Sequence, residues 1–320
     1  MKPLLILFAL FFQLTAYAQL PELYGEIFEH QSVIVDAVNR GATWMKISEK
    51  EKEDEPSSSS IVVMSPQKIE SITRYENTGS KINTTSNEYN AEGQLIYSTT
   101  VSPKEKELAK VAIAYDHLGN PISRVDTERG KIIEKQRTWY NAEGNIREHI
   151  QYKEGGNLIL NQWYYDYTPS GELWHTYLLD AKKDTLTVWT YACNKSGRLN
   201  RAKNEVEICR WTDKDRFGNT LVFEKRITKK SVRTLKEMFT PEGLKIASVL
   251  YDAKEQILER YSFEYVNGLL VETVKHEPND NDGFIWKETR DYHENGDLYN
   301  VINYDSRNEP TRFIRYEYQY

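Results

Sequence analysis

The sequence predicts an all-β protein: an elongated, twisted antiparallel array of about twenty short strands joined as β-hairpins, with a small N-terminal cap. Three observations predict it. A short turn motif recurs along most of the chain. The segments between its copies are rich in aromatic and β-branched residues, with 22 Tyr and 7 Trp in 320 residues. Apolar residues make up 39% and charged residues 28% of the chain, which favours a thin architecture over a deep core.

Residues 1–18 have the layout of a secretory signal peptide. Lys2 supplies the positive start, residues 4–12 form an apolar run, and Ala16 and Ala18 place small residues before Gln19. The run is shorter than the roughly 20 apolar residues that a membrane-spanning helix needs. We therefore expect an exported protein that begins at Gln19, without a transmembrane segment in its mature chain. The pattern does not distinguish periplasm, cell surface and medium.

Residues 19–60 differ from the rest and are predicted to form an N-terminal cap and polar linker over the first edge of the array. Apolar residues between positions 23 and 38 fall near helical spacing, although residues 33–35 fit a strand equally well. A charged run at residues 49–55, Pro56 and four serines then indicate a loop. Terminal repeats need such protection, because an open sheet edge pairs with other chains.

Residues 61–320 carry the repeat. Its pattern is an aromatic residue, Asn or Asp, two variable residues, Gly, one variable residue, and Leu or Ile, most clearly at residues 89–95 and 140–146. Asn or Asp initiates a turn and Gly takes the left-handed conformation that closes a short hairpin loop. The glycines predicted to occupy this position are Gly93, Gly119, Gly144, Gly156, Gly171, Gly197, Gly218, Gly243 and Gly296.

This motif resembles the YD repeat of the RHS type, and it is also similar to the Gly-turn hairpin repeats of antitoxin-like proteins related to the MORN family. Tyr115-Asp116 with Gly119, and Tyr251-Asp252, match the dipeptide that names the YD repeat. Most other copies have Asn or Thr in place of Asp. The resemblance covers about residues 70–310 and implies an extended antiparallel sheet built from successive hairpins.

The two cysteines, Cys193 and Cys209, both fall in predicted strands. An oxidising compartment permits a disulfide between them. Strands that are not immediate neighbours favour the alternative, in which both are small buried apolar side chains. The sequence leaves the pairing open.

No catalytic, cofactor or metal motif is recognisable. The chain lacks the nucleophile-elbow, phosphate-loop and zinc-protease motifs, and none of its six histidines has a partner at metal-ligand spacing. We therefore predict a non-enzyme without cofactor, metal site or catalytic residue. A net charge of −6 without a basic cluster argues against a nucleic-acid partner.

Aromatic clusters in the central third are the feature that favours ligand binding. Exposed rings stack on sugars, although rings that recur with the turn also fill the faces of a sheet. The leading hypothesis is a protein that presents a sheet surface to a protein or cell-envelope partner. A carbohydrate-binding surface protein is the alternative, and a hydrolase with an unidentified carboxylate pair is the second. The possible ligand-stacking residues are Trp139, Trp163, Tyr165, Trp174, Tyr177 and Trp189.

Overall fold

The computed structural model describes residues 30–52, 55, 57–65, 68–191, 204–278 and 283–320. The signal peptide, the start of the expected cap, Gly197 and Cys193 lie outside these residues. The chain divides into two compact units. Unit 1 comprises Met1–Lys135, Asp297–Tyr299 and Ile314–Tyr320, and unit 2 comprises Gln136–Gly296 and Asn300–Phe313.

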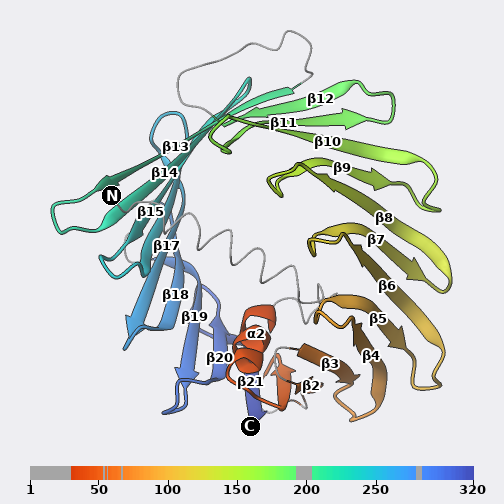
Figure 1. The fold of residues 1–320 in the computed structure, drawn as a ribbon. Helices are drawn as coiled ribbons and strands as arrows, with labels where there is room; N and C mark the ends of the chain where they lie inside the picture. The colour runs from red at the N-terminus through yellow and green to blue at the C-terminus, as the bar shows by residue number, and fades with distance from the viewer. Residues whose placement is uncertain (1–29, 53–54, 56, 66–67, 192–203, 279–282) are drawn as a thin grey trace. The chain divides into compact units, whose positions relative to one another are not determined.

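Unit 1 contains a helix and the first strands, each paired with its successor (Figure 1). Its elements are α2 (Gln31–Asn39), β1 (Trp44–Lys50), β2 (Ser58–Ser65), β3 (Lys68–Tyr75), β4 (Lys81–Tyr89), β5 (Leu95–Val101), β6 (Glu107–Tyr115) and β7 (Pro121–Glu128), with the first half of β8 (Lys131–Tyr140) and most of β21 (Pro310–Gln319).

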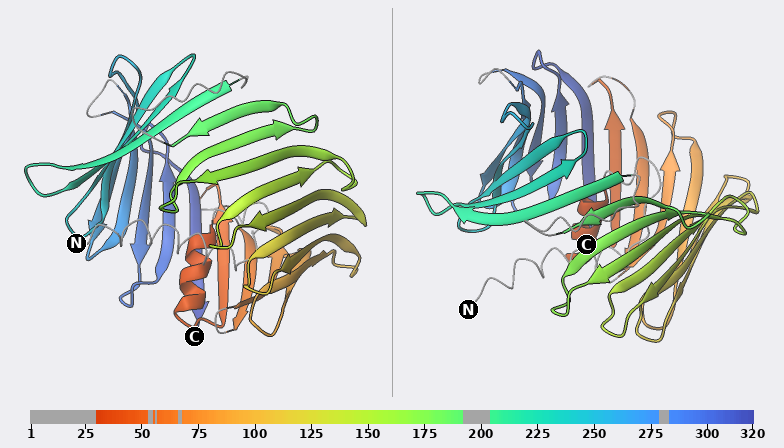
Figure 2. Two further views of the ribbon diagram at one scale, coloured as in Figure 1. Left: turned by 45° about the horizontal axis from the view of Figure 1, so that its top comes forward. Right: turned by 90° about the horizontal axis from the view of Figure 1, so that it is seen from above.

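Unit 2 is built from hairpins that follow one another along the chain (Figure 2). Its strands are β9 (Ile146–Tyr152), β10 (Ile159–Tyr167), β11 (Leu173–Asp180), β12 (Thr185–Thr190), β13 (Asn204–Lys214), β14 (Thr220–Thr228), β15 (Val232–Phe239), β16 (Lys245–Tyr251), β17 (Ile257–Val266), β18 (Leu269–His276), β19 (Phe284–Tyr292) and most of β20 (Leu298–Tyr304).

The fold is therefore an all-β series of hairpins, as predicted, with one difference in strand direction. Successive strands from β13 to β19 pair antiparallel. Strand β12, however, pairs parallel with β13, with Val188 opposite Glu205. The chain between these strands is too long for a tight turn, and a parallel pair needs a long connection.

The turns explain the first positions of the repeat motif. In the copy at residues 115–119, the Asp116 carboxylate accepts hydrogen bonds from the backbone N–H groups of Leu118 and Asn120, each at 2.9 Å. The backbone N–H of Gly119 donates to the Asp116 carbonyl at 3.1 Å. Asn, Asp, Ser and Thr at this position all offer a side-chain oxygen for the same purpose.

The aromatic position of the motif joins one repeat to an earlier one. The Tyr115 hydroxyl donates a 2.9 Å hydrogen bond to the carbonyl of Leu95, which is the apolar residue closing the previous copy. The Tyr167 hydroxyl bonds Ile146 in the same way at 2.8 Å. Each tyrosine therefore ties its own turn to a strand that begins about twenty residues earlier. The same bond recurs from Tyr89 to Ile69, from Tyr292 to Leu270 and from Tyr318 to Leu298.

The core of unit 1 lies between α2 and the first strands. Ile34 of α2, Met45 of β1 and Val62 of β2 are fully buried, and Ile47 of β1 is nearly so. The helix face is formed by Ile34, Ala37 and Val38, at the spacing of a helix that packs on one side. The spacing noted in the sequence is therefore that of a helix, and the strand alternative at residues 33–35 is wrong.

Strands also occupy part of the region expected to be cap and linker. In β1, Met45 and Ile47 are buried while Lys46 and Ser48 are half-buried, which is the alternation of a strand. Ser58, Ser59 and Ser60 pair with β1 although serine has a low strand propensity, because the ladder supplies their hydrogen bonds. The array therefore begins at Trp44 and not at residue 61.

The first strand does not form the open edge that the cap was expected to cover. Strand β1 pairs with β2 on one side and with β21 on the other. The backbone N–H of Thr43 donates to the Gln319 carbonyl at 2.8 Å, and Lys46 lies 3.8 Å from Glu317. The last strand of the chain therefore satisfies the edge of the first strand, which the cap was expected to cover.

Cys209 is disulfide-bonded. This corrects the favoured expectation of a small buried thiol at this position. The other cysteine in the sequence is Cys193. The register of β13 determines the surroundings of Cys209, because it pairs with Lys225 of β14.

Candidate functional site

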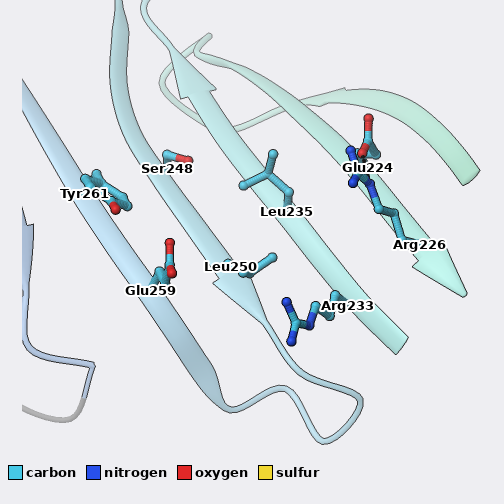
Figure 3. Close-up of a pocket in the computed structure, with 8 residues that line it drawn as sticks. All are labelled: Glu224, Arg226, Arg233, Leu235, Ser248, Leu250, Glu259 and Tyr261. Atoms are coloured by element: carbon cyan, nitrogen blue, oxygen red, sulfur yellow. Dashed lines mark hydrogen bonds and ion pairs between the residues drawn. The ribbon is translucent and has the colours of Figure 1, made fainter. Parts of the chain in front are cut away.

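A groove of about 270 Å³ crosses strands β14 to β17 in unit 2 (Figure 3). Alternation along the strands and the register of their pairing put its side chains on one sheet face, which we call the groove face. One row across the strands runs from Glu224 through Leu235 and Leu250 to Glu259. The remaining lining residues are Arg226, Arg233, Ser248 and Tyr261.

Charges gather at the β14 end of the groove. The Glu224 carboxylate accepts a 2.6 Å hydrogen bond from Arg226 Nε and a 2.7 Å hydrogen bond from Arg210 Nε. Burial alone would raise the pKa of Glu224, but the hydrogen bonds from Arg226 and Arg210 lower it. Glu224 is therefore held as a carboxylate, with its side chain only 14% exposed.

The middle and far end of the groove are different. Leu235 and Leu250 lie between the two charged ends (Figure 3). At the β17 end, Glu259 lies 3.8 Å from Lys275 of β18. Lys275 also bonds the Tyr261 hydroxyl, which raises the lysine pKa. The groove thus has a basic end, an apolar floor and a polar end that combines a carboxylate with hydroxyl groups.

The two groove carboxylates do not form an acid–base pair of the kind a glycosidase uses. Glu224 and Glu259 stand three strand spacings apart, which is about 14 Å, whereas the two carboxylates of a glycosidase lie about 5 to 10 Å apart. Each is also close to basic side chains, Arg210 and Arg226 for Glu224 and Lys275 for Glu259. Among the described residues, no group of three or more His, Cys, Asp and Glu side chains could hold a metal ion.

Three of the predicted ligand-stacking residues share the groove face. Tyr165 pairs with Thr176, and Thr176 pairs with Trp189, so these three form one row across β10, β11 and β12. Trp163 lies on the same face, with its ring 5.4 Å from that of His149. Trp189 pairs with Val206 of β13, so the groove face continues onto this strand. Arg210 lies an even number of residues after Val206 and therefore shares its face.

The other three candidates do not join them. Tyr177 pairs with Val188 and points to the opposite face. Trp139 follows Thr138, whose hydroxyl bonds His149 at 3.0 Å, so Trp139 also points to the opposite face and is 40% exposed. Trp174 stands beside the register shift of β10 and β11 and is 47% exposed. The six residues therefore do not form one patch.

The turn glycines occupy the backbone conformation that the motif requires. Those within the described residues have φ between 73° and 90°, in the left-handed region. At Gly119 an added Cβ would also lie 2.8 Å from the Gln94 side chain, whereas at Gly144 nothing lies within 4 Å. These glycines are structural and lie away from the groove, whose residues belong to strands.

Two features of this sheet were not predicted from the sequence. The first is the groove arginine Arg226, which lies in Glu224-Lys225-Arg226, a sequence that looks like a solvated charge run. Residues two positions apart in a strand share a face, so this spacing could have predicted that Glu224 and Arg226 lie on the same side of the sheet. The second feature is an aromatic pair on the opposite face, where the exposed Trp211 stacks on the half-buried Phe223 with ring centroids 4.9 Å apart and planes 3° apart.

Comparisons with known proteins show distant likenesses to solved structures. A porin-like protein from Bacteroides uniformis matches with 9% identity and a TM-score of 0.31, over 87% of this chain and 96% of that one. The Tc holotoxin pore of Photorhabdus luminescens matches with 11% identity and a TM-score of 0.23, over 79% of this chain and 16% of that one. A TcdB2–TccC3 structure matches with 10% identity and a TM-score of 0.18, over 76% and 18%.

No protein-family model and no curated protein matches the chain. Within the described residues, none of the helices has the length and apolar character needed to cross a membrane. Likenesses at these TM-scores do not assign the chain to a family.

Proposed function

We propose that this chain is an exported, non-enzymatic repeat protein that binds a protein or cell-envelope partner through the groove face of unit 2. The observation that carries the proposal is the groove itself, which combines a basic end with an apolar floor on a regular sheet surface. Binding sites commonly pair an apolar lining with a few polar groups that fix orientation.

Accessibility of the sheet supports this proposal. Every residue of β16 is half-buried, and most of β15 is too, so side chains on both faces of these strands stay within reach of a partner. A densely packed sheet would bury one face, as α2 does for β1 in unit 1. Strands of unit 2 thus present partly exposed side chains, and the stability of the hairpins does not depend on covering them.

Export is supported by two independent features. Residues 1–18 have the signal-peptide layout. Cys209 is in a disulfide, and such bonds persist in oxidising compartments such as the periplasm or the cell exterior. A non-enzymatic role is supported by the groove carboxylates, which are too far apart for glycosidase chemistry and lie beside basic side chains.

Capture from cell-envelope extracts tests the proposal. The mature wild-type protein is compared with the double variant Arg226→Glu and Arg233→Glu, which reverses two charges of the groove. The matched control is Lys229→Glu with Lys230→Glu, which makes the same charge change in the exposed turn of the same hairpin. We expect the groove variant to lose a captured partner that the wild type and the control retain. Equal capture by all three proteins would contradict the proposal.

A carbohydrate-binding role is the second candidate, and the pair of Trp211 and Phe223 favours it. Trp211 is 40% exposed, and its ring lies parallel to that of Phe223. An exposed flat ring of this kind can stack on the face of a sugar. A glycan array tests it with Trp211→Ala, using Phe217→Ala, which removes another exposed ring, as the control. Signal lost in the first variant alone would support a sugar site there, and no glycan signal for the wild type would reject it.

A further inference from the structure

The basic end of the groove holds more positive charge than its own carboxylate balances. Arg210, Arg226 and Arg233 project from β13, β14 and β15 around Glu224. Both Glu224 oxygens are used, one by Arg210 and the other by Arg226. Arg226 and Arg233 stand directly opposite each other in the β14–β15 ladder. Like charges at that position repel, so an anion between them would stabilise the pair.

Donors remain available at this end. Among the described residues, Arg233 makes no side-chain hydrogen bond or ion pair, and it lines the groove from the second position of β15, next to the β14–β15 turn (Figure 3). Arg226 donates through Nε to Glu224, which leaves its terminal N–H groups for another acceptor. A guanidinium has five N–H donors in a planar fork that fits a carboxylate or a phosphate with two parallel hydrogen bonds.

The rest of the groove restricts what can follow the anion. Leu235 and Leu250 lie next to the arginines, and they favour an apolar group joined to the anion over a bare ion. Beyond them, Ser248 and Tyr261 face each other across β16 and β17, beside Glu259. Carboxylate and hydroxyl oxygens accept N–H donors. The three strand spacings from β14 to β17 measure about 14 Å, and an extended chain of three residues spans about 10 Å.

We propose that the groove binds the carboxyl terminus of a peptide whose last residues are apolar. The terminal carboxylate lies on Arg226 and Arg233, an apolar side chain packs on Leu235 and Leu250, and a backbone N–H points toward Glu259. This inference rests on the proposed function, because it takes the groove as the binding site. A fatty acid shares the carboxylate and the apolar chain but offers no N–H donor, and inorganic phosphate offers the charge alone.

Calorimetric titration of the mature protein with four probes tests this ligand class. The probes are acetyl-Leu-Leu with a free carboxylate, the same dipeptide as its carboxamide, octanoate, and inorganic phosphate. We expect the free dipeptide to bind at least tenfold more tightly than each of the others. Equal affinity for the carboxamide would overturn the carboxylate contact. Equal affinity for octanoate would overturn the peptide assignment. Equal affinity for phosphate would mean that the groove binds an anion alone, and it would overturn both the carboxylate contact and the peptide assignment.

Variants locate the contact. Arg233→Gln removes the charge and keeps a polar side chain of similar length, and Lys230→Gln makes the same change in the adjacent exposed turn. Because Arg233→Gln loses a charged hydrogen-bonded contact, we expect it to bind the dipeptide about ten- to a hundredfold more weakly than the wild type. We expect Lys230→Gln to bind the dipeptide with unchanged affinity. Circular dichroism confirms that both variants are folded. Unchanged affinity in Arg233→Gln would overturn the proposal.

The two proposals fail separately. If the wild type retains its envelope partner in a groove-dependent manner but binds none of the four probes, the peptide assignment is wrong and the groove remains the binding surface. If groove reversal leaves envelope capture unchanged while the dipeptide binds in an Arg233-dependent manner, the ligand class stands and the envelope partner is excluded.

Discussion

The hydroxyl of Tyr115 donates to the carbonyl of Leu95, and this bond couples the first position of one repeat to the last position of the preceding one. It gives the aromatic residue of the motif a structural role that is separate from ligand binding. Burial raises the pKa of Tyr115, which is consistent with a phenol kept away from water. The recurring tyrosines are thus links between hairpins.

Tyr115→Phe should lower the free energy of unfolding by about 1 kcal/mol, the usual net contribution of one hydrogen bond. Chemical denaturation measures it. Tyr97→Phe is the control, because Tyr97 is exposed and its ring contact with Lys110 survives in phenylalanine. Equal losses in the two variants would show that the hydroxyl of Tyr115 contributes nothing specific.

Gly144→Val should destabilise the protein by about 1 to 3 kcal/mol, because a β-branched residue is strained at positive φ. Gly144 has φ of 81°, and nothing lies within 4 Å of an added Cβ, so the cost arises from the backbone alone. Thermal or chemical denaturation measures the change beside Glu143→Val in the same turn. A Gly144→Val protein as stable as the wild type would refute the turn assignment.

Glu255→Gly should have the opposite effect. Glu255 occupies the glycine position of a degenerate repeat copy with φ of 62°. Glycine adopts the left-handed conformation without steric strain, but it loses more chain entropy on folding. The free energy of unfolding should therefore rise by about 0.5 to 1 kcal/mol. Lys254→Gly, one position earlier and outside the left-handed region, should give no gain. A loss of stability in Glu255→Gly would contradict the prediction.

Stability should fall as the pH rises from about 10 to 12, the interval between the unfolded and the raised tyrosine pKa values. Burial raises the pKa of Tyr89 to about 12, and burial with the Asp166 hydrogen bond does the same for Tyr177. A raised folded pKa means that the folded state holds the proton more tightly. Its contribution is complete below pH 10 and disappears as the folded groups ionise. Denaturation from pH 9 to 12, with ultraviolet absorbance reporting tyrosinate, measures both changes, and constant stability across that range would contradict the sign.

Local features of this chain were predictable from sequence, because each depends on neighbours within a few residues. The turn at Gly144 is fixed by Asn141 and the glycine itself. The alternation of Met45 and Ile47 could also have identified β1, had the charged run after it not suggested a loop. The elongated form expected from the strand count stays a prediction that small-angle scattering can measure.

Features that depend on register were not predictable. The edge partner of β1 lies at the far end of the sequence, where Gln319 accepts from Thr43. The opposition of Arg226 and Arg233 depends on the length of the turn between their strands, since a shift of one residue would send one arginine to the other face. The same register divides the predicted aromatic residues between two faces.

Side-chain footprinting tests most directly the claim that the groove face is the binding surface. Hydroxyl-radical labelling of the mature protein is compared with and without envelope extract. We predict protection of Tyr261, Leu235 and Leu250 on the groove face, with unchanged labelling of Trp211 and Phe223 on the opposite face. Protection confined to Trp211 and Phe223, or no protection in either set, would contradict it.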